Sequence, residues 1–202
     1  MVKSPAQKHS AIETAYTPGR HGNPAESEPG IVFVERRNLS IAHIADNSGN
    51  QAIAQVVQKE TGCALPAKAN TATTNGACSV LSLAPARWLV VSAGHDDGAL
   101  AGGLRNSGTV VNDIGGGRTV IRLSGWRVRD LLAKGCPVDI HPCVFGPGAC
   151  AATDLLHIPA IIHNLDDYSY DVYVSRSYAL SLWDWLTDGA GEFGYQVDKV
   201  GA

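Results

Sequence analysis

Short runs of apolar residues, separated by polar and glycine-rich stretches, divide the chain from residue 31 onward into strands and helices. Runs rich in Val, Ile and Leu are typical of strands. In the first half they lie at residues 31–34, 39–44, 79–83, 87–92 and 109–114. Pro85 stands between two of these runs, which predicts a hairpin with the proline in its turn. Residues 63–77, rich in Ala, Thr and Asn, are expected to form a loop.

Two segments with helical spacing interrupt these strands. The first is expected to end at Gly62, because glycine commonly terminates helices. The expected N-caps are Asn47 or Ser48 for the first helix and Asp96 or Asp97 for the second. The apolar positions that should face the core are Ile53, Val56 and Val57 in the first helix and Leu100 and Leu104 in the second.

The same order of elements begins again after the three glycines at 115–117. Strand-like runs lie at residues 118–123, 154–158, 160–163 and 168–174, with a closing strand at 193–197. A helix capped by Ser124 should bury Val128, Leu131 and Leu132 and end before Gly135 and Pro137. A longer helix over 175–190 should present Tyr178, Leu182, Trp185 and Leu186 on one face.

Both halves therefore read strand, helix, hairpin, helix, strand, and Leu182 and Leu186 repeat Leu100 and Leu104 at one constant interval. We predict an α+β fold of duplicated split β-α-β units of ferredoxin-like type. The first unit should span 31–114 and the second 115–202. Residues 1–30, which carry four prolines, are expected to form an extended arm without a core of its own.

Composition and charge narrow the class of protein. Sixteen Lys and Arg against nineteen Asp and Glu give a net charge of −3, so the chain has no basic field for nucleic acid or an anionic membrane. No apolar run approaches the roughly 20 residues of a membrane helix, and the N-terminus lacks a signal peptide pattern. Five cysteines, an odd number, suggest free thiols in the cytoplasm. The low charged fraction, 17%, indicates a surface partly covered by a partner.

One cluster has the residue types that bind zinc. It consists of Cys136, His141, Cys143 and Cys150, which lie within fifteen residues of one another. The spacing contains no C-x2-C pair, so buried or loop thiols are the favoured interpretation and zinc remains an alternative.

Other candidate residues have simpler structural explanations. A nucleophilic pair would need Cys143 with His141 or His157, but nothing nearby marks a base and its orienting group. The glycines at 115–117 match no phosphate-binding motif and are interpreted as the turn between the repeats. His157 and His163 are expected to be hydrogen-bonded core residues, and the acidic pairs at 96–97 and 166–167 to cap or turn the chain. Trp183 and Trp185 should project from different sides of one helix, which leaves one of them for a partner.

Four segments of the chain resemble a known family. The segments GRTVIRLSGWRVRDLLAKGCPVDIHP, FGPGACAATDLLHIPAIIH, YDVYVSRSYALSLWDWL and EFGYQV are similar to the gamma subunit of heterotetrameric sarcosine oxidase, and the resemblance covers about residues 85–196. That family is in turn similar to the folate-binding fold of aminomethyltransferases. The aminomethyltransferases carry a catalytic acid where this chain has His157, Ile158 and Pro159.

The resemblance implies a cytoplasmic complex of alpha, beta, gamma and delta chains that oxidatively demethylates sarcosine to glycine. Hydrogen peroxide is formed, and the methyl carbon leaves as formaldehyde or 5,10-methylenetetrahydrofolate. It also implies that FAD, FMN, NAD, tetrahydrofolate and zinc belong to the partner subunits. The chain itself is then a structural subunit with no catalytic, cofactor-binding or metal residues. The alternative is a stand-alone folate-binding or aminomethyl-transfer protein.

Overall fold

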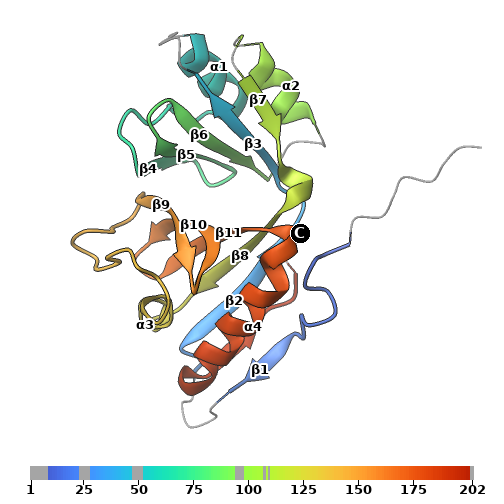
Figure 1. The fold of residues 1–202 in the computed structure, drawn as a ribbon, viewed down its shortest axis with the longest axis vertical. Coiled ribbons are helices and arrows are strands. Elements are labelled where there is room, and N and C mark those ends of the chain that lie inside the picture. Colours follow the sequence, from blue (N-terminus) through green and yellow to red (C-terminus); the bar gives the residue numbers. More distant parts are fainter. Residues whose placement is uncertain are drawn as a thin grey trace, which may run out of the picture.

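Two β-sheets form the centre of the molecule (Figure 1). The structure is a computed structural model that describes residues 9–22, 28–46, 52–93, 98–106, 108 and 110–200. The smaller sheet has the spatial order β4 (Thr71–Thr74), β5 (Cys78–Ala84), β6 (Arg87–Ser92), β3 (Ser40–Ala45), β7 (Val110–Asp113). The larger sheet has the order β1 (Gly19–His21), β12 (Tyr195–Val197), β2 (Ile31–Arg36), β8 (Arg118–Ser124), β11 (Ser169–Ser175), β10 (Ile158–Asp166), β9 (Cys150–Leu155).

Each sheet buries one face under its own pair of helices. The smaller sheet is covered by α1 (Ala52–Thr61) and α2 (Ala99–Arg105), and the larger by α3 (Val128–Ala133) and α4 (Ala179–Ala190). Three short 3-10 turns complete the described chain: η1 (Gly115–Gly117), η2 (Arg176–Tyr178) and η3 (Gly191–Phe193). Leu100 and Leu104 of α2 and their counterparts Leu182 and Leu186 of α4 are all buried, as their spacing predicts.

The sheet orders confirm the predicted duplication. In the smaller sheet β5, β6, β3 and β7 follow one another, and in the larger sheet β10, β11, β8 and β12 repeat this ferredoxin-like order. Each unit adds one outer strand, β4 or β9. The difference is β2, which inserts between β8 and β12 and pairs antiparallel with β8 and parallel with β12.

The position of β2 corrects the predicted grouping of residues 31–114 into the first unit. Its Ile31 and Phe33 side chains are fully buried in the core of the larger sheet. The Phe33 ring lies 5.5 Å from the Trp183 ring of α4, measured between centroids. The free energy gained by burying these two side chains therefore places β2 in the larger sheet, although β2 directly precedes β3 of the smaller sheet along the chain.

The other faces of the two sheets pack against each other. Ile41, Leu81, Leu89 and Val91 from the smaller sheet form one buried cluster with Val120, Cys150, Ile161 and Tyr173 from the larger sheet. The backbone N–H of Cys150 donates to the Asn70 carbonyl at 3.0 Å, which ties the neighbouring edges together. The two repeats thus share a common core between their sheets.

The described part of the N-terminal arm lies on the larger sheet of its own chain. Ile12 and Tyr16 are buried in its core, and β1 pairs with β12. The Tyr16 hydroxyl donates to the Asp198 carbonyl at 2.7 Å and accepts the Glu35 backbone N–H at 3.1 Å. The indole of Trp183 donates to the Ala15 carbonyl at 3.3 Å. Residues 9–22 are therefore held in place by contacts with the larger sheet and α4.

Several local predictions are wrong. Ser124 is the last residue of β8, and α3 begins after Arg127, which makes no side-chain cap. The loop predicted over 63–77 contains β4, whose threonines pair with β5. The strand predicted over 154–158 is broken by a hairpin turn at Leu156 and His157, both with positive φ.

The residues predicted as N-caps, Asn47 or Ser48 and Asp96 or Asp97, lie outside the described residues. The prediction for the second helix is nevertheless wrong, because the N-cap residue of α2 is Gly98, which forms no side-chain cap.

The face predicted for the last helix is also shifted. α4 buries Ala179, Leu182, Trp183, Leu186 and Ala190, whereas Tyr178 is exposed and Trp185 is only partly buried. The α4 interface therefore runs along the side that carries Trp183.

Candidate functional site

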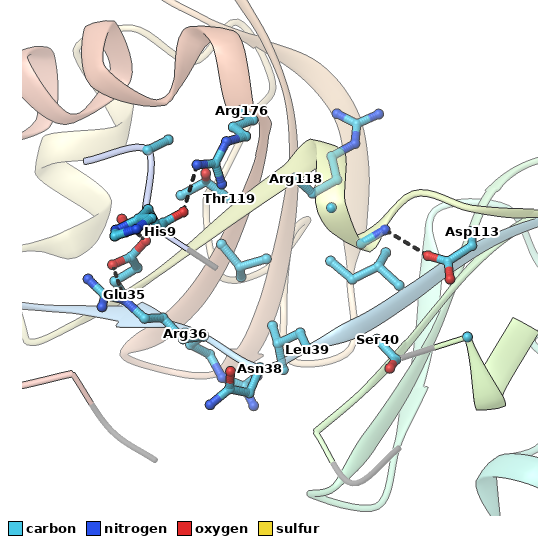
Figure 2. Close-up of a pocket in the computed structure, with 18 residues that line it drawn as sticks. His9, Glu35, Arg36, Asn38, Leu39, Ser40, Asp113, Arg118, Thr119 and Arg176 are labelled. Atoms are coloured by element: carbon cyan, nitrogen blue, oxygen red, sulfur yellow. Dashed lines mark hydrogen bonds and ion pairs between the residues drawn. The ribbon is translucent and has the colours of Figure 1, made fainter. Parts of the chain in front are cut away.

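A cavity of about 650 Å³ lies where the chain passes between the smaller and the larger sheet. We call it the junction pocket (Figure 2). Its walls come from the N-terminal arm, the end of β2, the start of β3, the end of β7 with η1, the start of β8, and η2. Segments from both ends and from the middle of the sequence therefore meet at this one place.

Four arginines line the junction pocket, and their partners differ: Arg36, Arg37, Arg118 and Arg176. Arg37 Nε donates to Glu35 Oε2 at 2.7 Å, and Glu35 Oε1 also accepts the Ser10 hydroxyl at 2.5 Å. Arg118 Nη1 donates to the Ser175 hydroxyl at 3.2 Å, and Arg176 Nη2 to the His9 carbonyl at 2.6 Å. Within the described chain neither Arg118 nor Arg176 forms an ion pair.

The fourth arginine, Arg36, belongs to a buried ion cluster on the inner face of the larger sheet. Asp171 is fully buried and accepts from Arg36 Nη1 at 2.9 Å and from Arg122 Nε and Nη2 at 2.8 and 2.9 Å. Burial disfavours the charge of Arg122, but its hydrogen bonds to Asp171 and the negative charge of that carboxylate raise its pKa overall. The side chains of Arg36 and Arg122 are 21% and 34% exposed, whereas Asp171 is buried, so the cluster spans from the core to the surface.

His163 lies beside this cluster on β10, directly across from Asp171 in the strand register. It is fully buried, as predicted, but neither ring nitrogen has a hydrogen-bond partner among the described residues. Burial lowers the pKa of the imidazole to about 4; the charge of Asp171 opposes this effect, while Arg122 and Arg36 add to it. His163 is therefore neutral at physiological pH.

We expect the stability of the chain to fall as the pH drops from about 6.5 toward 4. In this range the unfolded chain protonates His163 while the folded chain does not, so protons favour unfolding. The lowering of the His163 pKa from 6.5 to about 4 corresponds to about 3 kcal/mol of stability, present in full above pH 6.5 and lost toward pH 4. Urea unfolding from pH 7.5 to 4 measures the slope, which His163→Leu should reduce. His9→Gln, at an exposed site, is the control; an unchanged slope in His163→Leu would contradict the assignment.

The structure does not bring the predicted zinc ligands together. Cys150 is buried between the sheets, where burial raises its thiol pKa to about 12, whereas Cys143 is exposed. His141 Nδ1 accepts the backbone N–H of Cys143 at 3.3 Å. No group of three metal-type ligands occurs among the residues that the structure describes. The cysteines here are free thiols in different environments.

The other candidate residues from the sequence lie in separate turns and strands. His157 is exposed in the β9–β10 turn, which corrects its predicted place in the core, and Ile158 and Pro159 begin β10. Asp166 Oδ1 accepts the Tyr168 N–H at 2.8 Å and so shapes the β10–β11 turn. The three glycines form η1 between β7 and β8, and Gly115 and Gly116 line the junction pocket.

Sequence reasoning missed an exposed aromatic patch at one end of the larger sheet. We define this aromatic patch as Trp126, Arg127 and Tyr168. The two rings are 55% and 61% exposed, and a backbone bond from Gly125 N to Tyr168 O, 3.0 Å long, joins their turns. The Arg127 guanidinium lies 4.6 Å from the centre of the Trp126 ring. A large exposed tryptophan beside arginine is typical of protein interfaces. In the sequence, the only signal of the aromatic patch was that Trp126 lies outside the apolar face of any predicted helix.

The paired ferredoxin-like units define the class of fold. It is similar to that of the glycine cleavage system aminomethyltransferase T from Bartonella henselae, with a TM-score of 0.64 and 10% identity over 93% of this chain and 57% of that one. It is more similar to a chain of the heterotetrameric sarcosine oxidase from Corynebacterium sp. U-96, with a TM-score of 0.79 and 23% identity over 92% and 95% of the two chains.

The sarcosine oxidase gamma subunit family matches residues 45–192, and the chain belongs to this family. Among curated relatives, the sarcosine oxidase gamma subunit of Corynebacterium sp. strain U-96 is 27% identical over 77% of this chain and 75% of its own length. The gamma subunit from Arthrobacter sp. is 31% identical over 57% and 58%. No helix in the described part of the chain is long and apolar enough to cross a membrane.

Proposed function

We propose that this chain is a structural subunit of a heterotetrameric sarcosine oxidase, assembled with alpha, beta and delta chains in the cytoplasm. The complex oxidatively demethylates sarcosine to glycine, with hydrogen peroxide as one product and formaldehyde or 5,10-methylenetetrahydrofolate as the other. FAD, FMN, NAD, tetrahydrofolate and zinc are held by the partner subunits. Membership in the gamma subunit family supports this assignment.

The aromatic patch is the observation that carries the structural role. Trp126 and Tyr168 expose large apolar surfaces to solvent. Burial of these rings against a partner would be favourable, because it would release ordered water. Tryptophan, tyrosine and arginine are the residues that most often dominate the binding energy of interfaces. We infer that one of the larger subunits covers this patch in the complex. The buried carboxylate of Asp171, in contrast, already accepts three N–H donors and is committed to holding the fold.

Trp126→Ala should weaken association with the partner subunits by about tenfold to a hundredfold, the usual range for a central interface tryptophan. Copurification from cells that express all four chains, followed by size-exclusion chromatography over a dilution series, measures the effect. Leu180→Ala is the matched control, since Leu180 is also an exposed apolar residue but lies on α4. A Trp126→Ala complex that persists to the same dilution as the wild type would contradict the proposed interface.

The non-catalytic role has a direct activity test. Sarcosine-dependent peroxide formation should require the assembled complex, and the isolated chain should form neither peroxide nor 5,10-methylenetetrahydrofolate. Reconstitution with and without this chain, normalised to the flavin content of the partners, separates a structural effect from a chemical one. Aminomethyl transfer by the isolated chain would contradict the proposal and favour the aminomethyltransferase alternative.

A further inference from the structure

We propose that the outer edge of β7 binds an extended segment of one of the partner subunits, which pairs antiparallel with β7 as an added strand of the smaller sheet. β7 is the last strand of this sheet, on the side opposite β4 (Figure 1). The inference rests on the proposed function, because the segment that covers the edge comes from another chain of the same complex.

The smaller sheet has two edges, and within the described residues the chain itself covers only one of them. At the β4 edge, Thr71 forms a bridge with Ala149, and the Ala72 N–H donates to the Gly148 carbonyl at 2.7 Å. At the other edge, β3 is the one described strand that pairs with β7, so the outer side of β7 has no strand beside it. An uncovered strand edge is a template for pairing with another chain.

The hydrogen bonds to β3 show which backbone groups of β7 point outward. The Ile114 N–H donates to the Ile41 carbonyl at 2.9 Å, so Ile114 directs its backbone groups toward β3. In an antiparallel ladder such residues alternate with residues whose N–H and C=O point away from the partner strand. Asn112 therefore also faces β3, whereas Val111 and Asp113 direct their N–H and C=O groups to the outer edge.

The second unit of the fold carries an added strand at the corresponding edge. β12 occupies in the larger sheet the position that β7 occupies in the smaller sheet, and its outer edge pairs antiparallel with β1. That pairing involves only three residues of each strand. β7 has four residues, so it is long enough to accept a strand in the same way.

The side chains of β7 indicate the chemistry of the segment. Val110 is 62% exposed, whereas Val111 is buried in the core that α2 covers. An apolar β-branched side chain opposite Val110 would bury its exposed surface. The exposed carboxylate of Asp113 accepts the Gly115 N–H at 3.1 Å but makes no ion pair within the described chain. We therefore expect an apolar residue of the segment opposite Val110 and a lysine or arginine opposite Asp113.

Hydrogen–deuterium exchange at single-residue resolution, on the isolated chain and on the assembled four-chain complex, tests the proposal. The amides of Val111 and Asp113 should exchange at least about tenfold more slowly in the complex, because both become hydrogen-bonded to the added strand. The Ile114 amide is already bonded to β3 and should be slow in both states, which makes it the internal reference.

The exchange experiment separates this inference from the proposed function. Equal exchange of Val111 and Asp113 in the isolated chain and in a complex that does form would overturn the added strand alone. If the four chains do not assemble, the proposed function is contradicted, and this occupant with it. Protection in the isolated chain that rises with its concentration would show that a second copy of the chain covers the edge, which also overturns the proposal.

Val110→Lys gives an independent test, because a charged side chain on an edge strand opposes pairing with another chain. Association in a dilution series should weaken by about tenfold. Val144→Lys is the matched control, since Val144 is 66% exposed in the loop between α3 and β9 and should assemble like the wild type. Val110→Thr keeps the β-branched shape and should lose less than about threefold. Unchanged association of the Val110→Lys chain would overturn the proposal, and an unchanged thermal unfolding curve of this variant excludes misfolding.

Discussion

Asp171→Asn is expected to lower the free energy of unfolding by about 3 kcal/mol. Removal of one partner of a buried ion pair leaves the other charges uncompensated, which typically costs 3–5 kcal/mol. The asparagine has nearly the same shape, but it leaves Arg36 and Arg122 facing each other without an anion and turns an N–H donor toward their N–H groups. Because both guanidiniums are partly exposed, water compensates in part, so the lower end of the range applies.

Urea unfolding at pH 7 measures this loss, and Asp130→Asn is the matched control. Asp130 also pairs with an arginine, Arg127, at 2.7 Å, but this pair is exposed and three residues apart on the chain. Its removal should change stability by less than about 0.5 kcal/mol, as is usual for surface ion pairs. Equal effects of the two substitutions would show that the Asp171 cluster does not stabilise the larger sheet.

Trp183→Ala is expected to lower the free energy of unfolding by about 3–5 kcal/mol and to release the N-terminal arm. The substitution opens a cavity beside Phe33 and Tyr16, whose rings lie 5.5 and 5.2 Å from the Trp183 ring. It also removes the indole N–H bond to the Ala15 carbonyl. Since the start of the arm lines the junction pocket, its release should also open this wall of the cavity.

Thermal unfolding and limited trypsin digestion measure the two effects. Released residues should be cleaved faster at Arg20, which lies in β1 on the arm. Trp185→Ala is the control, because Trp185 is only partly buried and should lose no more than about half as much stability. A Trp183→Ala chain with unchanged digestion at Arg20 would contradict the role of this tryptophan in holding the arm.

Most of the candidate site could not be predicted from the sequence. The ion cluster joins Arg36 and Arg122 to Asp171 across separations of 135 and 49 residues. Nothing in the local pattern of these residues distinguishes them from solvated charges on alternating strands. The aromatic patch was missed for a related reason: Trp126 and Tyr168 lie in separate turns that meet only because β8 and β11 are neighbours.

The sequence did determine the order of most elements, because each is marked by its local pattern of apolar residues, although β1 and β4 were not predicted. The four-residue spacing of Leu100 and Leu104, repeated at Leu182 and Leu186, marked both helices, and the repeated order of elements indicated the duplication. Glycine at 62, with positive φ, ended α1 where predicted. Membership in the gamma subunit family rests on the sequence as well.

Only the tertiary structure decided where β2 and the arm lie and which charges share a site. A strand or an arm can bury its apolar side chains against any sheet that offers a complementary face, and the sequence does not state which face is nearest in space. Burial of Phe33 and Tyr16 beside Trp183 places β2 and the arm on the larger sheet, where both line the junction pocket.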